Sequence, residues 1–257
     1  MRPIIEVKNV SKAFGGLQVI NNCSIEVAKG SVTGMIGPNG AGKSTLFNII
    51  AGTLAEDSGQ VLMDGEDITH ETPDALFHRG LLRTFQIAHE FSHMTALENL
   101  MMVPPRQDGE NLLSTWLRPS LVRDQEAEVR QRALEVIEFI NLAHVKNELA
   151  GNLSGGQKKL LELGRTMMTD AKVVLLDEIA AGVNRTLLVD LVRNIQRLNQ
   201  EMGYTFLVIE HDMDMIAELC DPVIVLAQGQ VMMQGTIDEV RNNPEVVEAY
   251  FGNALDA

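Results

Sequence analysis

Residues 37–45 have the types and spacing of a loop that binds the phosphates of a nucleotide. They fit the pattern G-x-x-x-x-G-K-[ST]. The glycines let successive backbone N–H groups point at phosphate oxygens, and a following helix adds partial positive charge at its N-terminus. We expect Lys43 to reach the β- and γ-phosphates and the Ser44 hydroxyl to bind Mg²⁺. The candidate nucleotide-binding residues here are Gly37, Pro38, Asn39, Gly40, Ala41, Gly42, Lys43, Ser44 and Thr45.

Asp177 and Glu178 follow a continuous apolar run at residues 173–176, which is typical of a strand buried on both faces. Carboxylates at the end of such a strand need water, a metal ion or a partner. Beside a phosphate loop, we expect Asp177 to bind Mg²⁺, directly or through water, and Glu178 to polarise the attacking water. The alternative is a pair of acidic residues at the solvent end of a strand.

Three other features allow both a functional and a structural interpretation. The sequence Leu-Ser-Gly-Gly-Gln at residues 153–157 could be a helix N-terminus that Ser154 caps. His211 follows an apolar strand pattern at residues 205–210, and ligands of open α/β sheets bind at the carboxyl ends of strands. A lone histidine at such a place is more often structural. Phe14, next to two glycines, either stacks on an adenine or belongs to the core.

The elements that must position these residues follow an α/β pattern. Residues 32–36 predict a short buried strand before the phosphate loop, and residues 46–51 predict the first turns of a helix after it. Residues 4–10 and 19–27 predict two strands, and residues 61–68 a hairpin that turns at Asp64 and Gly65. These segments indicate a small antiparallel layer beside the nucleotide-binding core.

The middle of the chain changes character. From about residue 87 to residue 130 the pattern is irregular, and three prolines break any long element. Helical spacing then resumes at Val129, Ala133, Val136, Ile137 and Ile140. We therefore expect a helical subdomain at residues 87–166, inserted into a core made of residues 1–86 and 167–257. At the C-terminal end, residues 223–233 predict a hairpin, and Thr236 with Glu239 predicts a capping box.

Composition limits the classes of function. The chain has 257 residues, with 21 basic and 35 acidic side chains and a net charge of −14, so its surface repels nucleic acid and anionic lipid at long range. Cys23 and Cys220 match no metal-binding spacing and indicate reduced thiols of a cytosolic protein. The sequence shows no signal peptide and no apolar run near the ~18–20 residues of a membrane span. We expect a soluble chain that contacts a membrane only through a partner.

The order of these motifs resembles the ATPase subunits of ABC transporters over essentially the whole chain. The set consists of the phosphate loop, Gln86, residues 153–157, the Asp177–Glu178 pair and His211. The five-residue signature at 153–157 distinguishes this family from other NTPases, because many NTPases share phosphate loops and acidic strand ends. Within that family the chain is most similar to the ATPases of branched-chain amino-acid importers. The stretches that support this are residues 14–16, 83–86, 180–184, 210–213 and 248–252.

The resemblance implies an α/β P-loop NTPase fold, with a mostly parallel sheet, an N-terminal antiparallel layer and an inserted helical subdomain. It implies Mg²⁺-dependent ATP hydrolysis, with Phe14 against the adenine. In the implied dimer, the phosphate loop and strand-end residues of one subunit face the signature of the other across ATP. The implied catalytic residues are Glu178, His211 and Gln86, the metal ligands Ser44, Gln86 and Asp177, and the signature residues Ser154, Gly155, Gly156 and Gln157.

The resemblance also implies partners and a location. The partners are integral-membrane permease subunits, a second ATPase subunit in a homodimer or heterodimer, and indirectly a periplasmic or extracytoplasmic substrate-binding protein, with no nucleic acid. The location is peripheral, on the cytoplasmic face of the plasma (inner) membrane. Two alternatives stay open: the ATPase of a lipid or lipopolysaccharide exporter, and a soluble ABC-type ATPase that works without a permease.

Three positions depart from the family pattern. Ile179 follows Glu178 where proline is common, so the backbone there is less constrained. Asn184 and Arg185 replace an aspartate and a proline that are frequent in the family, although asparagine is familiar in the branched-chain group. Beyond Gln86, the family docks a short permease helix into a groove, and Phe91 either contributes to that groove or belongs to the core.

Overall fold

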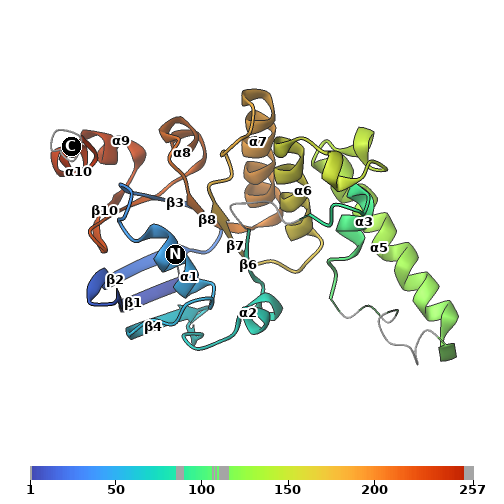
Figure 1. The fold of residues 1–257 in the computed structure, drawn as a ribbon, viewed down its shortest axis with the longest axis horizontal. Helices are drawn as coiled ribbons and strands as arrows, with labels where there is room; N and C mark the ends of the chain where they lie inside the picture. The colour runs from blue at the N-terminus through green and yellow to red at the C-terminus, as the bar shows by residue number, and fades with distance from the viewer. Residues whose placement is uncertain (1, 85–89, 106, 108, 110–115, 252–257) are drawn as a thin grey trace. The chain divides into compact units, whose positions relative to one another are not determined.

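The chain divides into two compact units (Figure 1). The computed structural model describes residues 2–84, 90–105, 107, 109 and 116–251. Unit 1 comprises Met1–Gln86, Ala171–Ala180 and Ile195–Ala257, and unit 2 comprises Ile87–Asp170 and Ala181–Asn194. Within the described part of the chain, no helix has the length and apolar character needed to cross a membrane. The functional division expected from the sequence, into residues 1–86 with 167–257 and residues 87–166, stays a prediction.

A six-stranded sheet in the order β10-β9-β3-β8-β7-β6 forms the centre of unit 1 (Figure 1). Neighbouring strands from β9 to β6 run parallel, and β10 is antiparallel to β9. All residues of β3, β7 and β8 are buried, as their apolar runs predict. The carboxyl ends of these three strands share one edge of the sheet. The strands are β3 (Val32–Ile36), β6 (Leu81–Arg83), β7 (Val173–Asp177), β8 (Thr205–Ile209), β9 (Val223–Ala227) and β10 (Gln230–Gly235).

The second sheet of unit 1 is the antiparallel layer that the sequence predicts. Its strand order is β2-β1-β4-β5, and every neighbouring pair is antiparallel. The predicted hairpin turns at Asp64 and Gly65, which both have positive φ angles. The strands are β1 (Pro3–Phe14), β2 (Leu17–Ala28), β4 (Ser58–Met63) and β5 (Glu66–Asp67).

Helix α1 (Lys43–Ile50) joins the two sheets through one hydrophobic core. Its buried Leu46 and Phe47 belong to the same cluster as Val7 of β1 and Leu175 and Leu207 of the six-stranded sheet. Burying one such side chain contributes about 1.5–3 kcal/mol relative to exposure. The helix after the phosphate loop is therefore fixed against the strands that carry the other candidate site residues.

The remaining helices of unit 1 are short. One of them, α8, packs on the face of the six-stranded sheet that is opposite to α1. A Cβ atom at Gly34 of β3 would lie 3.1 Å from the Cβ of Cys220, directly after α8. Both cysteines are buried free thiols, and burial raises the pKa of Cys220 to about 12, which leaves it unreactive. The predicted capping box of Thr236 and Glu239 is present. These helices are α2 (Pro73–Arg79), α8 (Met213–Leu219), α9 (Ile237–Asn242) and α10 (Pro244–Phe251).

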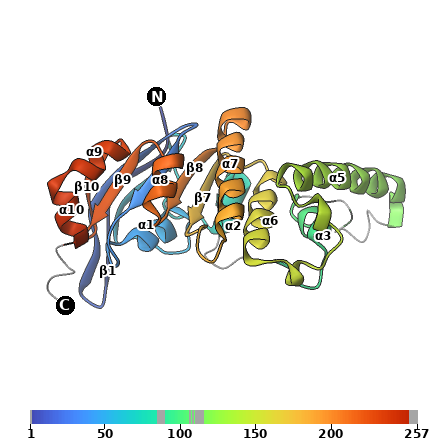
Figure 2. The same ribbon diagram turned by 90° about the horizontal axis from the view of Figure 1, so that it is seen from above.

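Unit 2 is helical in its described residues, and α3, α5 and α6 pack on one another (Figure 2). A Cβ atom at Gly164 of α6 would lie within 3.3 Å of side chains from α3 and α5, so a larger residue would have to displace these side chains. Pro119 begins α5 rather than breaking it, because a proline at the first helical position loses only an N–H that has no partner in the helix. The elements are α3 (Ala96–Met101), α5 (Pro119–Phe139), η2 (Ala143–Val145), η3 (Ala150–Asn152), α6 (Gly155–Met167) and the first part of α7 (Arg185–Met202).

Candidate functional site

The phosphate loop connects β3 to α1, and its backbone requires glycine at two places. A Cβ atom at Gly37 would lie 2.1 Å from the backbone oxygen of Leu226. Gly42 caps α1 with φ 98°, a conformation that side chains disfavour. The loop can therefore curl tightly around the N-terminus of α1, where unpaired backbone N–H groups favour an anion.

Lys43 lies across this loop rather than extending into solvent. Its Nζ donates to the carbonyl oxygens of Gly37 at 2.7 Å and Pro38 at 3.1 Å. Burial lowers the pKa of the ammonium, and the nearby carboxylates of Glu178 and Asp177 act in the opposite direction. The side chain is thus held in place next to the space where phosphates would bind.

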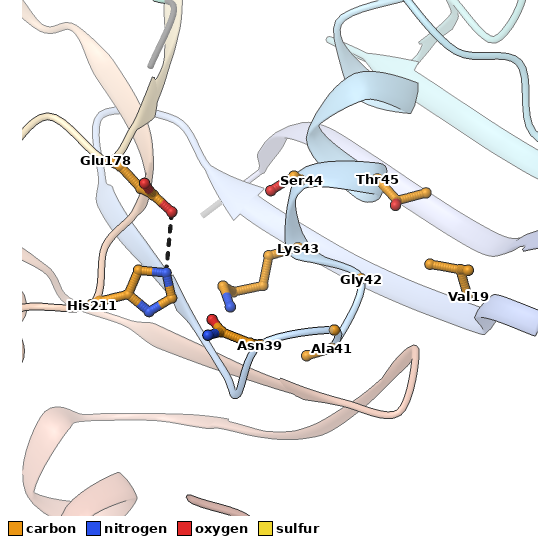
Figure 3. A pocket seen from close by; sticks show the side chains of 10 residues that line it. Val19, Asn39, Ala41, Gly42, Lys43, Ser44, Thr45, Glu178 and His211 are labelled. Atoms are coloured by element: carbon orange, nitrogen blue, oxygen red, sulfur yellow. Dashed lines mark hydrogen bonds and ion pairs between the residues drawn. The ribbon is translucent and has the colours of Figure 1, made fainter. Parts of the chain in front are cut away.

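A polar pocket of about 200 Å³ opens in front of the loop (Figure 3). The pocket is lined by most of the predicted loop residues and by two strand-end residues. Ser44 is one of these loop residues, and it is exposed at the start of α1. Val19 of β2 also lines the pocket, and no motif pointed to it. The lining residues are Val19, Asn39, Gly40, Ala41, Gly42, Lys43, Ser44, Thr45, Glu178 and His211.

Glu178 and His211 meet at the ends of neighbouring strands, as the motifs predict. Asp177 of β7 and Ile209 of β8 are partners in the parallel sheet, so the residues just beyond them are close. The Glu178 Oε1 lies 3.2 Å from the His211 Nε2 (Figure 3). The Glu178 N–H donates to the Ile209 carbonyl at 3.0 Å, and Glu178 has φ 47°. This conformation turns its carboxylate toward the phosphate loop.

The sequence interpretation did not assign a role to Glu210, the residue between β8 and His211. It is only 4% exposed, and its carboxylate accepts from the N–H groups of Ala180 at 2.7 Å and His211 at 3.2 Å. Burial raises the pKa of this carboxyl, and the two N–H bonds act in the opposite direction. Glu210 therefore ties the turn after Glu178 to His211, and it supplies a constraint at the place where Ile179 replaces the usual proline. A buried acid beside a candidate histidine is the signal that could have revealed it.

We expect Glu210→Ala to lower kcat for ATP hydrolysis while ATP binding stays near the wild-type value. A hydrogen bond to a charged group is worth about 1.5–3 kcal/mol, so a loss of about tenfold or more is expected if the bond to Ala180 holds the turn. Steady-state kinetics give kcat and KM separately. Glu218→Ala, on the adjacent helix α8, is the control. A fall in ATP affinity with unchanged kcat would contradict the positioning role.

Asp177, the last residue of β7, is buried and does not line the pocket. Its Oδ2 accepts from the Arg83 guanidinium at 3.0 Å, and the same guanidinium donates to the Asn48 side chain of α1. Neither Arg83 nor Asn48 was predicted as a site residue. Asp177 and the Ser44 hydroxyl offer oxygen ligands, the type that Mg²⁺ prefers, and Mg²⁺ usually combines one or two side chains with substrate phosphates. This donor set fits Mg²⁺ bound together with a nucleotide.

The predicted signature forms the start of α6 in unit 2. Ser154 caps the helix and makes a capping box with Gln157: Ser154 Oγ accepts from the Gln157 N–H at 3.3 Å, and the Gln157 side chain accepts from the Ser154 N–H at 2.9 Å. Gly155 is exposed, whereas a Cβ atom at Gly156 would lie 2.5 Å from Leu187 of α7. Gly156 lets α7 approach the helix, and Gly155 places no side chain at the exposed start of α6.

Two family departures have a local explanation in unit 2. The Asn184 side chain accepts from the Leu187 N–H at 3.0 Å, which is the N-cap bond that aspartate makes equally well. Arg185 is the first residue of α7, the position that proline also favours. Both residues are therefore compatible with a helix that starts here.

The structure bears on one of the two remaining predicted site residues, Phe14. Phe14 is 48% exposed at the end of β1 and does not line the pocket, and its ring lies 5.7 Å from the Nζ of Lys12. Its expected contact with adenine stays a prediction. Gln86 lies outside the described residues.

Comparison with known proteins decides the family. Residues 20–181 match a family model described as ABC transporter, and residues 230–256 match one described as branched-chain amino acid ATP-binding cassette transporter. The chain belongs to the ATP-binding subunits of ABC transporters. This family hydrolyses ATP to power transport, so the chain is an ATP hydrolase.

Two relatives and one solved structure illustrate the similarity of this ABC ATPase. It is 40% identical to the probable branched-chain amino acid transport ATP-binding protein LivG of Archaeoglobus fulgidus, covering 97% of this chain and 95% of the relative. It is 38% identical to BraF of Pseudomonas aeruginosa, a high-affinity branched-chain amino acid transport ATP-binding protein, with 98% and 99% covered. A crystal structure of the ADP conformation of an ABC transporter cassette superposes with a TM-score of 0.83 at 38% identity, covering 98% and 100%. The predicted P-loop ABC ATPase fold is confirmed.

Proposed function

We propose that the chain is the ATPase subunit of an importer for branched-chain or related neutral amino acids. The observation that carries the proposal is its similarity over nearly the whole length to subunits with this named role, LivG and BraF. The match of residues 230–256 to a model specific to branched-chain transporters supports it independently of the shared ATPase motifs. The match at residues 230–256 therefore favours this proposal over a lipid exporter ATPase or a permease-free ATPase.

The chemistry proposed for the pocket follows from its side chains. The loop N–H groups and Lys43 hold the phosphates of ATP. Glu178 accepts a proton from the attacking water at its carboxylate, and the His211 Nε2 at 3.2 Å keeps that carboxylate oriented toward the loop. Mg²⁺ would be held by Ser44 and Asp177, with Gln86 as a further proposed ligand, and would neutralise charge on the phosphates. Positioning and electrostatics thus supply most of the rate enhancement.

The second half of the nucleotide site comes from another subunit in this proposal. The phosphate loop lines the pocket of unit 1, and the exposed start of α6 at Ser154 and Gly155 would supply a second anion site to the nucleotide of another subunit. ATP between the phosphate loop of one subunit and residues 154–157 of the other would join both. Hydrolysis would then release the dimer and move the permease.

The partners proposed on this basis are membrane permease subunits, a second ATPase subunit and, indirectly, an extracytoplasmic substrate-binding protein. Attachment is peripheral, at the cytoplasmic face of the inner membrane. The importers that the chain resembles use two different ATPase subunits, so a heterodimer is expected in the cell.

Lys43→Ala tests the function directly. We expect this substitution to abolish tight ATP binding and uptake of labelled leucine, because it removes the ammonium held against the loop. The complex is purified by tagging the chain, and uptake is measured in proteoliposomes. Lys29→Ala, at an exposed turn after β2, is the control. Co-purification of lipid-export proteins, or leucine uptake that does not need ATP, would refute the proposal.

A further inference from the structure

Arg83 makes a bridge that the described function leaves unexplained. It ends β6 and is only 16% exposed in its side chain, although it is charged. One nitrogen of its guanidinium donates to the Asn48 Oδ1 and another to the Asp177 Oδ2. Its Nε is buried and has no partner among the residues that the structure describes. The guanidinium therefore joins α1 to the end of β7.

These two elements carry the side chains proposed to bind Mg²⁺. Asn48 lies one helical turn after Ser44 on α1, and Asp177 is itself the last residue of β7. A guanidinium is planar and rigid, so holding both partners at once fixes the helix face relative to the strand end. The bond to Oδ2 also fixes the plane of the Asp177 carboxylate and hence the direction of its other oxygen.

We propose that Arg83 is a positioning residue that sets the separation of the Ser44 hydroxyl and the Asp177 carboxylate and thereby strengthens metal binding. This inference rests on the proposed function, in which those two side chains bind Mg²⁺. Mg²⁺ demands near-octahedral geometry at about 2.0–2.1 Å from its ligands, so small shifts of a ligand weaken it. Residues that orient metal ligands typically contribute about 10–100-fold to metal affinity.

The positive charge of Arg83 has the opposite effect, because it repels a cation and competes for Asp177. Substitution by lysine separates the two effects. Lysine keeps the charge but presents a single point donor on a flexible chain, so it cannot hold Asn48 and Asp177 in a fixed geometry. If position matters, Arg83→Lys weakens metal binding although the charge is unchanged.

The test measures metal affinity rather than turnover. Mn²⁺ binding to the full chain with ADP is followed by electron paramagnetic resonance of the free ion. We expect Arg83→Lys to weaken Mn²⁺ binding by about tenfold, while ADP binding in EDTA and the melting temperature stay near wild type. Arg79→Lys is the matched control, since Arg79 also makes a double bridge, to Glu66 and Glu71. Asn48→Ala removes the other end of the Arg83 bridge and should weaken Mn²⁺ in the same direction.

The other outcomes distinguish a wrong metal site from a wrong role for Arg83. If Ser44→Ala and Asp177→Asn both leave Mn²⁺ binding unchanged, the proposed metal site is wrong. If those two variants weaken it but Arg83→Lys and Asn48→Ala behave like Arg79→Lys, only the positioning role of Arg83 is overturned. Tighter Mn²⁺ binding in Arg83→Lys and Arg83→Gln would also overturn it, because Arg83 would then act as a competing cation.

Discussion

Glu178→Gln is expected to retain ATP binding and to lose ATP turnover. A positioned general base contributes about 10²–10⁴-fold to a rate, so kcat should fall by that order. Glutamine keeps the size of the side chain and can still contact His211 Nε2, which lies 3.2 Å from the present carboxylate, but it cannot accept a proton from water. Because the phosphate loop and Lys43 are unchanged, nucleotide affinity should stay within about twofold, well below the tenfold that 1.4 kcal/mol represents.

The physical consequence of this loss is a trapped complex. If hydrolysis releases the dimer, the variant should sediment as an ATP-bound dimer, whereas the wild-type chain returns to monomers as ATP is consumed. Glu26→Gln, on an exposed position of β2, controls for the change of charge. His211→Ala should give a smaller fall in kcat, because it removes orientation and leaves the base in place. ATP hydrolysis by Glu178→Gln at the wild-type rate would show that another group accepts the proton.

The strand-end residues could be predicted because the physics that places them is local. Continuous apolar runs predict buried parallel strands, and the residues that follow such strands meet at one edge of the sheet. Glu178 and His211 meet there, as expected. The phosphate loop could be predicted from its motif, and the positive φ of Gly42 is a local requirement of that loop, although the close approach at Gly37 is to the distant Leu226.

The residues that support the site could not be predicted in this way. Arg83 reaches Asn48 and Asp177 across 35 and 94 positions of the chain, and no short motif encodes such a bridge. Glu210 extends an apolar strand by one residue. Its sequence context therefore does not indicate which backbone N–H groups donate hydrogen bonds to its carboxylate. Helix α3 was missed because it is short and is defined by the capping box of Thr95 and Glu98 rather than by apolar periodicity.

Phe91 shows how the structure narrows an alternative that the sequence left open. Its side chain is 48% exposed and therefore is not a core residue of the chain alone. Its backbone is held on both sides by Asn99, which is fully buried: the Phe91 N–H donates to Asn99 Oδ1 at 2.8 Å, and Asn99 Nδ2 donates to the Phe91 carbonyl at 3.1 Å. An apolar ring on a fixed backbone is suited to anchor a partner, since the ordering cost of binding is already met.

We therefore expect Phe91→Asp to uncouple transport from ATP hydrolysis. The Arg165 guanidinium lies 5.5 Å from the centre of the Phe91 ring, so an aspartate at this position gains a nearby cation and should not unfold unit 2. The docking of a permease helix, in contrast, would lose an aromatic anchor and meet a charge. Such losses at interface hot spots cost about 2 kcal/mol or more, so coupled leucine uptake should fall by more than about tenfold.

The measurement compares ATPase activity of the isolated subunit with uptake by the reconstituted transporter. Phe91→Leu keeps an apolar side chain and should transport close to the wild-type rate. Met202→Asp places the same charge at a residue that is 52% exposed in unit 1, and it should leave both activities intact. Loss of both activities in Phe91→Asp would assign Phe91 a role in folding, because Asn99 and Arg165 would then depend on its ring. Retention of both would mean that the permease contacts a different surface of unit 2.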